Sequence, residues 1–568
     1  MSTDLLATAV EAGERWAILD SDPRTRGQLD ALVDRRDPSL IELFERRLEF
    51  GTAGLRAAVG PGPNRMNAVV VRQTTVAVVE WLRAGGVDEP RILIGYDARA
   101  DSAYFAAECA RSAVASGARA DLANRAVATP VVAHALAVGM FDAGVVITAS
   151  HNPPGDNGYK LYLGDGMQIV APVDNEISEI IDRLARGWHN HVARIDETEI
   201  DNAQVDVGAW LRAHRHAAVR AAERLSGSSV QTGQRAEARA LRMVYTPLHG
   251  VGGEPVLDAL AATGYPRPTI VEAQFQPDPT FPTVNFPNPE EPGALDDALA
   301  LAELVGADVV AANDPDADRL AIAVRKRSGS GFAALSGDEL GVLLGDYVLR
   351  HTSGDRVVAR SIVSSRLLDA IARSAGVEAA VTLTGFKWLA RSAGDYPNHD
   401  WVFGYEEAIG YAIGDHVRDK DGVTALLVAL EMLGELSSTE RTVWDRLDEL
   451  AVEHGLHVSA PFSLRFADEP RRALECVERL TGAPPQTLGG IKVAEVGPIG
   501  GGRLAPTAGL MLRCVDDAQV IVRPSGTEPK LKVYIEVIER SISIADARVL
   551  AAERLAAITN DLRSLLEP

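Results

Sequence analysis

From about Val69 onward the chain alternates short β-branched apolar runs with amphipathic stretches, and this alternation constrains its fold more than any other feature. Apolar runs such as 91–96, 143–150, 269–275 and 307–313 are typical of buried strands, whereas stretches such as 101–117 and 337–351 have the apolar periodicity of helices. Strands that alternate with helices predict α/β layers built on mixed, mostly parallel sheets.

These elements form three consecutive sets, and each set ends in a strand that is followed by a polar loop containing glycine. The three loops begin with Ser150 (SHNPPGDNGYK), Asp314 (DPDADR) and Glu406 (EEAIGY). Open α/β sheets bind ligands beyond the carboxyl ends of their strands. We therefore expect the chemistry of this protein to lie in these loops.

The pattern changes after about Val452, where strands such as 519–524 and 530–539 precede a long closing helix over 543–566. This arrangement predicts a smaller α+β domain. At about 150 residues per domain, a chain of 568 residues has room for roughly four domains. We place them at 1–210, 211–330, 331–452 and 453–568.

Composition excludes several classes of protein. The 57 basic and 79 acidic residues give a net charge of −22, which disfavours binding to nucleic acid or to anionic lipid. The three cysteines lack CxxC spacing, so they predict neither a zinc site nor a disulfide framework, and a reducing cytoplasm fits best. We see no export signal and no apolar run long enough to span a membrane. A P-loop is absent, and the single GxGxxA match lacks a βαβ context, which argues against a nicotinamide enzyme.

The sharpest local signal is a set of three carboxylates, Asp314, Asp316 and Asp318, directly after an apolar strand. Oxygen ligands suit a hard cation, and three of them would leave Mg²⁺ about three further octahedral positions. An EF-hand is excluded because its sixth and twelfth positions would be Arg319 and Arg325. A solvated acidic turn is the alternative for this loop.

Ser150 ends its strand and is followed by His151, by two glycines and by Lys160. A hydroxyl at a strand end, with a cation on the same loop, suits a nucleophile or a phosphate carrier. The alternative is a turn in which Ser150 and Asn152 satisfy the backbone. The GxSxG elbow of serine hydrolases is absent.

Two further loops carry polar groups that suit a phosphosugar. Arg523, Ser525, Gly526, Thr527 and Lys530 offer a guanidinium fork, hydroxyls, a close backbone approach and a second cation, which together fit a dianionic phosphate. Carboxylates such as Glu406 can hold sugar hydroxyls, and a lysine such as Lys420 can shuttle a proton. A solvated hairpin and a solvated helix start are the alternatives for these two loops.

Taken in order, TASHNPPGDNGYK, DPDADR, GYEEAIGY with DKDG, and RPSGTEPK resemble the motifs of the α-D-phosphohexomutase superfamily. FGTAGLR, TPLHGVGG and TGFKW are similar to further family segments, and the last two resemble the longer branch that contains phosphopentomutases. The resemblance covers nearly all of the chain after the first forty residues. It implies four domains in a heart-shaped fold around one central cleft.

The resemblance also implies roles for individual residues. Ser150 would be the phosphorylated serine and, with Asp314, Asp316 and Asp318, a ligand of Mg²⁺. Glu406 would contact sugar hydroxyls, and Arg523, Ser525, Gly526, Thr527 and Lys530 would hold the phosphate that does not react. Arg56, Lys160 and Lys420 match basic residues near the proton steps. Arg319 beside the metal loop, which would bind substrate, and His151 beside the nucleophile match family positions that support the site.

The function implied is a mutase that interconverts the 1- and 6-phosphates of glucose or mannose through a phosphoserine and a bound bisphosphate, primed by a sugar bisphosphate. Ala408 stands where many phosphoglucomutases have serine, so ribose and deoxyribose phosphates are kept as alternative substrates. A Mg²⁺-dependent sugar phosphatase and a non-catalytic sugar-phosphate-binding protein also remain open. We expect a cytoplasmic monomer or homodimer whose partner is a small phosphosugar.

Overall fold

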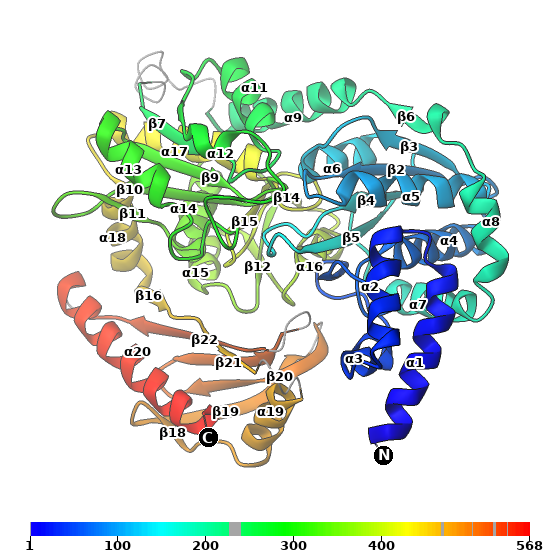
Figure 1. The fold of residues 1–568 in the computed structure, drawn as a ribbon. Coiled ribbons are helices and arrows are strands. Elements are labelled where there is room, and N and C mark those ends of the chain that lie inside the picture. The colour runs from blue at the N-terminus through cyan, green and yellow to red at the C-terminus, as the bar shows by residue number, and fades with distance from the viewer. Residues whose placement is uncertain are drawn as a thin grey trace. The chain divides into compact units, whose positions relative to one another are not determined.

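The computed structural model describes residues 2–226, 240–466, 471–501, 504–525, 530–541 and 543–567. The chain forms two compact units. The first comprises Met1–Arg224, Arg239–Ala334 and Asp415–Leu427, and the second comprises Leu225–Ala238, Leu335–Gly414 and Val428–Pro568. Each unit contains two sheets (Figure 1).

The first unit begins with three helices that the sequence patterns did not identify, α1 (Ser2–Leu19), α2 (Pro23–Asp34) and α3 (Ser39–Glu45). Asp22 caps α2 by accepting a hydrogen bond from the backbone N–H of Arg24. Trp16, Leu29 and Leu40 are buried in the same apolar core as the first sheet. The N-terminal helices are therefore part of the core of this unit.

The first sheet has the strand order β1-β5-β4-β2-β3-β6. Its strands are β1 (Leu55–Ala58), β2 (Arg91–Tyr96), β3 (Arg119–Ala123), β4 (Ala143–Ile147), β5 (Asp156–Leu163) and β6 (Gln204–Val205). The β2, β3, β4 and β6 strands pair in parallel, whereas β5 is antiparallel to both β4 and β1. Its helices are α4 (Ala68–Ala84), α5 (Ser102–Ala115), α6 (Thr129–Val138), α7 (Val173–Ala185) and α8 (His189–Asp196), followed by the 3₁₀ turn η1 (Asp201–Ala203) and by α9 (Gly208–Ser226).

The second sheet of this unit has the order β11-β10-β9-β7-β8, with strands β7 (Met243–Thr246), β8 (Thr269–Ile270), β9 (Val309–Asn313), β10 (Leu320–Arg325) and β11 (Phe332–Ala334). The helices are α11 (Gly253–Thr263), α12 (Glu272–Phe275) and α13 (Asp296–Val305). The predicted strand over 269–275 is wrong beyond Ile270, because Glu272–Phe275 forms a helical turn. Gln274 within it is buried and bonds Thr246 and Thr283, so tertiary contacts override the β-branched pattern.

The second unit contains a four-stranded sheet and a seven-stranded sheet. The first of these has the order β13-β12-β14-β15, with β12 (Arg356–Ser361), β13 (Glu378–Thr382), β14 (Asp400–Glu406) and β15 (Gly410–Ile413). Its helices are α14 (Gly337–His351), α15 (Leu367–Ser374) and α16 (Phe386–Arg391), with the 3₁₀ turn η2 (Ser392–Asp395). They are followed by α17 (Gly422–Ser438) and α18 (Val443–His454), and α17 starts in the first unit.

The seven-stranded sheet is antiparallel throughout and contains β16 (Leu456–Ser459), β17 (Phe462–Arg465), β18 (Thr487–Leu488), β19 (Ile491–Gly501), β20 (Leu504–Cys514), β21 (Gln519–Pro524) and β22 (Lys530–Glu539). α19 (Arg472–Gly482) and the closing helix α20 (Ile544–Leu566) pack against it around Leu512, Val520 and Val533. The predicted fold class is confirmed, with three mixed α/β sheets followed by an α+β region.

The same strand arrangement recurs in all three α/β sheets. A strand that pairs in parallel on one side, β4, β9 or β14, is followed by an antiparallel hairpin partner, β5, β10 or β15. The polar loops beginning with Ser150, Asp314 and Glu406 therefore belong to hairpins at the carboxyl ends of these strands. This arrangement holds each loop at both ends by a strand ladder.

In the described parts of the chain, no single helix is long and apolar enough to cross a membrane. One bent pair, Gly422–Ser438 with Val443–His454, meets the length and composition limits together across an 87° break.

A buried polar network lies in the second unit at the start of α14. Asp338 Oδ1 accepts hydrogen bonds from Ser365 N at 2.7 Å and from the Tyr405 hydroxyl at 3.0 Å. Glu536 of β22 accepts hydrogen bonds from the backbone N–H of Arg366 and from Ser365 Oγ, and it pairs with His457. Burial raises the pKa of Asp338 to about 6, from an ordinary value of 3.8.

We expect Asp338→Asn to stabilise the second unit increasingly as pH rises. The raised pKa means that the folded state binds the proton of Asp338 more tightly than the unfolded state, so this group's contribution to stability is lost as pH rises from 3.8 through about 6. The full difference in unfolding free energy is roughly 3 kcal/mol well above pH 6, and about 1.4 kcal/mol of it falls between pH 5 and 7.5. Urea unfolding of wild type and variant at these two pH values measures it. The exposed Asp355→Asn serves as control, and a stability difference that does not change with pH would contradict the expectation.

Candidate functional site

Ser150 lies in the tight connection between β4 and β5. The strand ends at Ile147, three residues before the predicted end at Ser150, and Ser150 itself has a left-handed backbone with φ of +53°, which a pleated strand does not contain. Its backbone N–H donates to Thr148 Oγ1 at 2.8 Å, and its hydroxyl donates to Asp314 Oδ2 at 2.6 Å. His151 Nδ1 lies 3.3 Å from the same hydroxyl. The structure thus brings the predicted nucleophile to the predicted metal loop, 164 residues away in the sequence.

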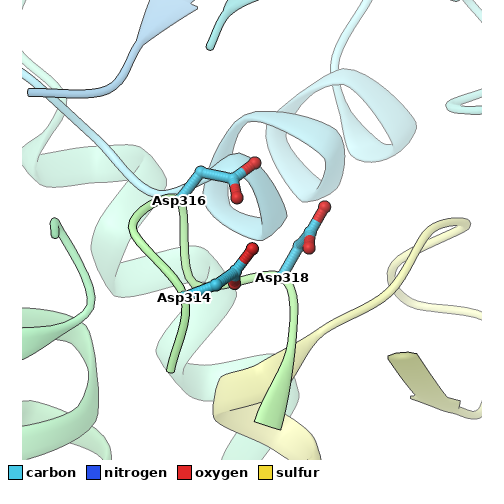
Figure 2. Close-up of side chains that lie close together, drawn as sticks. All are labelled: Asp314, Asp316 and Asp318. Atoms are coloured by element: carbon cyan, nitrogen blue, oxygen red, sulfur yellow. The ribbon is translucent and has the colours of Figure 1, made fainter. Parts of the chain in front are cut away.

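The loop between β9 and β10 gathers three buried carboxylates. Asp314, Asp316 and Asp318 are at most 1% exposed, and one oxygen of each lies within 4.8 Å of the others (Figure 2). Ala317, between them, has a left-handed backbone with φ of +58°, which folds the loop so that these side chains gather. Burial and the charges of Asp316 and Asp318 raise the pKa of Asp314 well above its ordinary value.

These carboxylates fit a hard divalent cation. Among the described residues, Oδ1 of Asp316 and Oδ1 of Asp318 are buried and accept no hydrogen bond. Buried carboxylate oxygens normally have partners, and oxygen donors at this spacing are the ligands that Mg²⁺ and Ca²⁺ prefer. The three aspartates, with the Ser150 hydroxyl beside Asp314, can therefore hold a metal ion.

Cations converge on the same carboxylates. Lys160 of β5 is buried, and its Nζ lies 2.6 Å from Asp316 Oδ2 and 2.7 Å from Asp318 Oδ2. Lys420 Nζ lies 3.3 Å from Asp318 Oδ2. Arg319 Nε lies 3.8 Å from Asp318 Oδ1 and 3.9 Å from Asp314 Oδ2.

Arg56 of β1 also lies at this site, where its Nη1 donates to Asn152 Oδ1 at 3.4 Å. Burial lowers the pKa of its guanidinium, while the nearby charge of Asp316 raises it. The first unit therefore assembles Ser150, His151, Arg56, Lys160, Arg319, Lys420 and the three aspartates, all of which were predicted from the sequence.

The segment that contains Lys420 packs closely against the loop of the three aspartates through the residues that follow Lys420. Gly422 packs so closely that a Cβ atom there would lie 2.4 Å from the carbonyl oxygen of Arg319. Asp421 accepts hydrogen bonds from the backbone N–H groups of Val423 and Thr424 at the start of α17. The sequence patterns missed this role of Gly422, although a glycine beside a charged run is a signal for close backbone approach.

Histidines on the far side of this segment also escaped sequence reasoning. His214 of α9 is 1% exposed, and its Nε2 lies 2.9 Å from Asp421 Oδ2. His416 Nε2 lies 3.6 Å from the same oxygen, and the ring of His134 stands between the two, about equally far from each. No loop or spacing signal marks His214, because it lies on an ordinary amphipathic helix.

The other predicted residues lie in the second unit. Glu406 ends β14 and accepts a hydrogen bond from the backbone N–H of Gly385 at 2.6 Å. Arg523 lies in β21, and Ser525 N donates to the carbonyl of Lys530 at 2.8 Å. The charges of Glu406, Glu407 and Arg523 all act on the pKa of Tyr534 in β22, so these side chains share one neighbourhood. Gly526 and Thr527 lie outside the described residues.

Glu407 is a residue of this second group that was not assigned a role. Its Oε2 accepts hydrogen bonds from Ser361 Oγ at 3.2 Å and from Ser364 Oγ at 3.4 Å. Burial raises its pKa, while the charges of Lys532 and Arg523 act in the opposite direction. Its position next to Glu406 was visible in the sequence, but paired glutamates most often only solvate a helix start.

Comparison with known proteins gives a consistent result along the chain. Models of the phosphoglucomutase/phosphomannomutase family match as α/β/α domain I at residues 47–187, domain II at 223–329, domain III at 336–452 and the C-terminal domain at 504–542. A probable phosphomannomutase from Haemophilus influenzae is 39% identical over 86% of this chain and 96% of its own length. A probable phosphoribomutase from Schizosaccharomyces pombe is 32% identical over 97% of both chains.

A solved structure supports the same fold. The crystal structure of a putative phosphomannomutase from Thermus thermophilus superposes with a TM-score of 0.67, covering 92% of this chain and 100% of that one at 20% identity.

Proposed function

Because the chain belongs to the phosphoglucomutase/phosphomannomutase family, and is therefore a phosphosugar mutase, we propose that it interconverts the 1- and 6-phosphates of a hexose, glucose or mannose. The observation that carries this proposal is the 2.6 Å contact between the Ser150 hydroxyl and Asp314 within the triad of buried aspartates. A serine in that position can hold a phosphoryl group beside a cation and away from water.

Ser150 acts as an intramolecular phosphate carrier. Phosphorylated Ser150 gives its phosphoryl group to the free sugar hydroxyl. The Oγ–P bond breaks and a sugar O–P bond forms, while the sugar hydroxyl loses its proton and Ser150 Oγ takes one up. The sugar, now a bisphosphate, turns over in the site. Its other phosphoryl group then returns to Ser150: the second sugar O–P bond breaks, an Oγ–P bond forms, the Ser150 hydroxyl loses its proton and the sugar oxygen that is released takes one up.

The metal expected here is Mg²⁺, held by Asp314, Asp316, Asp318 and an oxygen of the phosphorylated Ser150. When bound, it neutralises charge that develops on the transferring phosphoryl group. A sugar bisphosphate such as glucose 1,6-bisphosphate is proposed as the activator that first phosphorylates Ser150.

The cations of the site supply and accept protons at the reacting oxygen. Lys160 and Lys420 approach the triad from two elements, and Arg56 and His151 lie next to the Ser150 loop. General acid and base roles are proposed among these four side chains. Arg319, beside Asp314 and Asp318, faces the same carboxylates and is proposed to contact substrate.

Further residues are proposed to bind the part of the sugar phosphate that does not react. Glu406 offers carboxylate oxygens to sugar hydroxyls. Arg523, Ser525 and Lys530, with Gly526 and Thr527 of the same loop, offer the donors that a phosphate needs. One such set must accept the phosphate in both orientations of the bisphosphate.

A pentose phosphate is the second candidate substrate. Ala408 removes a hydroxyl next to the proposed sugar-binding Glu406, and the relative that covers 97% of the chain is named a probable phosphoribomutase. A change in one sugar hydroxyl alters binding by only one or two hydrogen bonds, so a single substitution can change which sugar is preferred. This alternative specifies the same chemistry, with exchange between the 1- and 5-phosphates.

Initial rates on glucose 1-phosphate, mannose 1-phosphate and ribose 1-phosphate, measured with Mg²⁺ and a bisphosphate primer, test the proposal. We expect one of the two hexose phosphates to have the highest kcat/KM, with isomerised sugar phosphate as product. A higher kcat/KM on ribose 1-phosphate would replace the hexose assignment by the pentose one. Release of inorganic phosphate as the main product would indicate a phosphatase, and binding without turnover would indicate a carrier protein.

The remaining expectations are proposals of the same kind. The net charge of −22 supports a small phosphosugar, rather than nucleic acid or a lipid surface, as the partner. Three buried, unpaired thiols are consistent with a reducing cytoplasm. We propose a cytoplasmic monomer or homodimer.

A further inference from the structure

Arg99 binds the backbone of the Ser150 loop through four hydrogen bonds. It follows β2, and its side chain is 1% exposed. Its Nη2 donates to the carbonyl oxygens of Ser150 and Asn152, both at 2.6 Å. Its Nη1 donates to those of Pro153 at 2.7 Å and Asp156 at 3.0 Å. One guanidinium thus holds four carbonyl groups across the whole turn between β4 and β5.

The loop requires such support because its backbone is strained at the nucleophile. Ser150 has a φ of +53°, a conformation that residues other than glycine rarely adopt unless their surroundings enforce it. In this conformation the Ser150 hydroxyl reaches Asp314 Oδ2. A relaxation of Ser150 to an extended backbone would move the hydroxyl away from the aspartates.

Asp97 connects Arg99 to the other side of the same loop. Its Oδ2 lies 3.3 Å from Arg99 Nε and accepts a hydrogen bond from Thr148 Oγ1 at 2.6 Å. Thr148 Oγ1 in turn accepts from the backbone N–H of Ser150. The Ser150 peptide is therefore held through its carbonyl group by Arg99 and through its N–H group by the Asp97–Thr148 pair.

The shape of the side chain makes arginine specific for this task. A guanidinium presents its donors in a fixed plane, which allows two carbonyl groups to be bound by each terminal nitrogen. A lysine at this position would keep the positive charge beside Asp97, but a single ammonium group cannot span the same four carbonyl groups. The guanidinium carbon also lies 5.2 Å from the ring centre of Phe281, so an aromatic face covers it.

We propose that Arg99 is a positioning residue for the mutase reaction, which holds Ser150 in the left-handed conformation that places its hydroxyl beside Asp314. This inference rests on the proposed function of Ser150 as phosphate carrier. Arg99 acts through the loop backbone and not on the substrate. Its loss should therefore lower the rate of phosphoryl transfer in both directions and leave sugar binding nearly intact.

The kinetic test compares Arg99→Lys and Arg99→Ala with wild type. Misplacement of a reacting group by about 1 Å can lower a rate by about 100-fold. We expect kcat to fall roughly 100-fold in Arg99→Ala and at least about 10-fold in Arg99→Lys, with KM within about 3-fold of wild type. Added guanidinium, at about 50 mM, should raise kcat of Arg99→Ala by about 10-fold, whereas the same concentration of NaCl should not.

Arg91→Ala is the matched control. Arg91 begins β2, the strand that precedes Arg99, and its side chain also donates to a backbone carbonyl, that of Met140. It lies at the end of β2 that is opposite to the Ser150 loop. We expect kcat of this variant within about 2-fold of wild type and no response to guanidinium. A kcat of Arg99→Lys within about 2-fold of wild type would overturn the proposal.

A second measurement does not depend on mutase activity. Hydrogen–deuterium exchange of the amides over 148–158 should be at least about 10-fold faster in Arg99→Lys than in wild type, while exchange in α4 stays unchanged. Unchanged exchange over 148–158 would overturn the positioning role even if the protein proved not to be a mutase. Faster exchange in a protein without mutase activity would instead support the loop contact and contradict the proposed function. Arg99→Lys keeps the buried charge balance, so it provides this readout if Arg99→Ala fails to fold.

Discussion

Replacing Ser150 by alanine is expected to lower mutase kcat by on the order of 10⁴-fold or more, because the variant has no oxygen to carry the phosphoryl group. One other hydroxyl, that of Thr129 at the start of α6, donates to the triad, to Asp316 Oδ2 at 2.7 Å, but it lies outside the β4–β5 loop. Coupled assays of sugar phosphate isomerisation, with the bisphosphate primer present, measure the effect.

The fold of this variant should be nearly unchanged. Ser150→Ala removes the hydrogen bond to Asp314 and the 3.3 Å contact with His151 Nδ1, and a net change of about 1 kcal/mol in unfolding free energy is the usual size of such a loss. Ser178→Ala is a suitable control, because the Ser178 hydroxyl donates within its own helix, to the carbonyl of Asp174. Mutase activity of Ser150→Ala above about 1% of wild type, in protein free of wild-type contamination, would show that another group is the nucleophile.

The first part of the site was predictable from the sequence because of where its residues fall on their strands. Ser150 and Asp314 both follow short apolar runs, and such runs place the residues after them at the carboxyl edge of a sheet. The alternate spacing of Asp314, Asp316 and Asp318 added a chemical preference for a hard cation. Neither argument needed the tertiary structure, and the proximity of Ser150 to the triad followed only when the motifs were taken together.

Arg99 was missed although a signal for it was present. Asp97 and Arg99 are the first polar residues after the apolar run 91–96, so the rule that pointed to Ser150 also applied to them. Their chemistry gave no reason to single them out, because an aspartate and an arginine two residues apart usually form a surface pair. Only the four carbonyl contacts reveal what the guanidinium does.

Long-range packing could not be predicted at all. His214 meets Asp421 across 207 residues, and Gly422 fits against the Arg319 carbonyl because of a close approach between distant segments. The helical turn at Glu272–Phe275 has a related cause, since the buried Gln274 amide finds partners on two other segments. In each case the residue is visible in the sequence, but its contact partner lies on a distant segment and is determined by the tertiary structure.

The second large effect is expected for Asp314→Asn, which should abolish the stabilisation of the fold by Mg²⁺ and lower kcat. In wild type, Mg²⁺ at about 100 times its dissociation constant should stabilise the folded state by about 2.7 kcal/mol, because it binds the folded chain and not the unfolded one. Removal of one of three carboxylate ligands should reduce this stabilisation to near zero at the same Mg²⁺ concentration, and kcat should fall by about 1,000-fold. Thermal unfolding with and without Mg²⁺ measures the first effect, and initial rates measure the second.

The same substitution should not destabilise the protein when Mg²⁺ is absent. Three buried carboxylates repel one another, so neutralising one of them relieves repulsion while Asn retains an oxygen that can accept from Arg319 N, as Asp314 Oδ1 does at 3.0 Å. Asp308→Asn provides the control, because Asp308 lies just before β9 and pairs with Arg242 at the surface. Relative to wild type, Asp314→Asn should therefore have a lower unfolding free energy with Mg²⁺ and a higher one without it, whereas loss of a purely structural aspartate would lower it in both conditions. If Asp314→Asn kept the full stabilisation by Mg²⁺, Asp314 would not be a metal ligand.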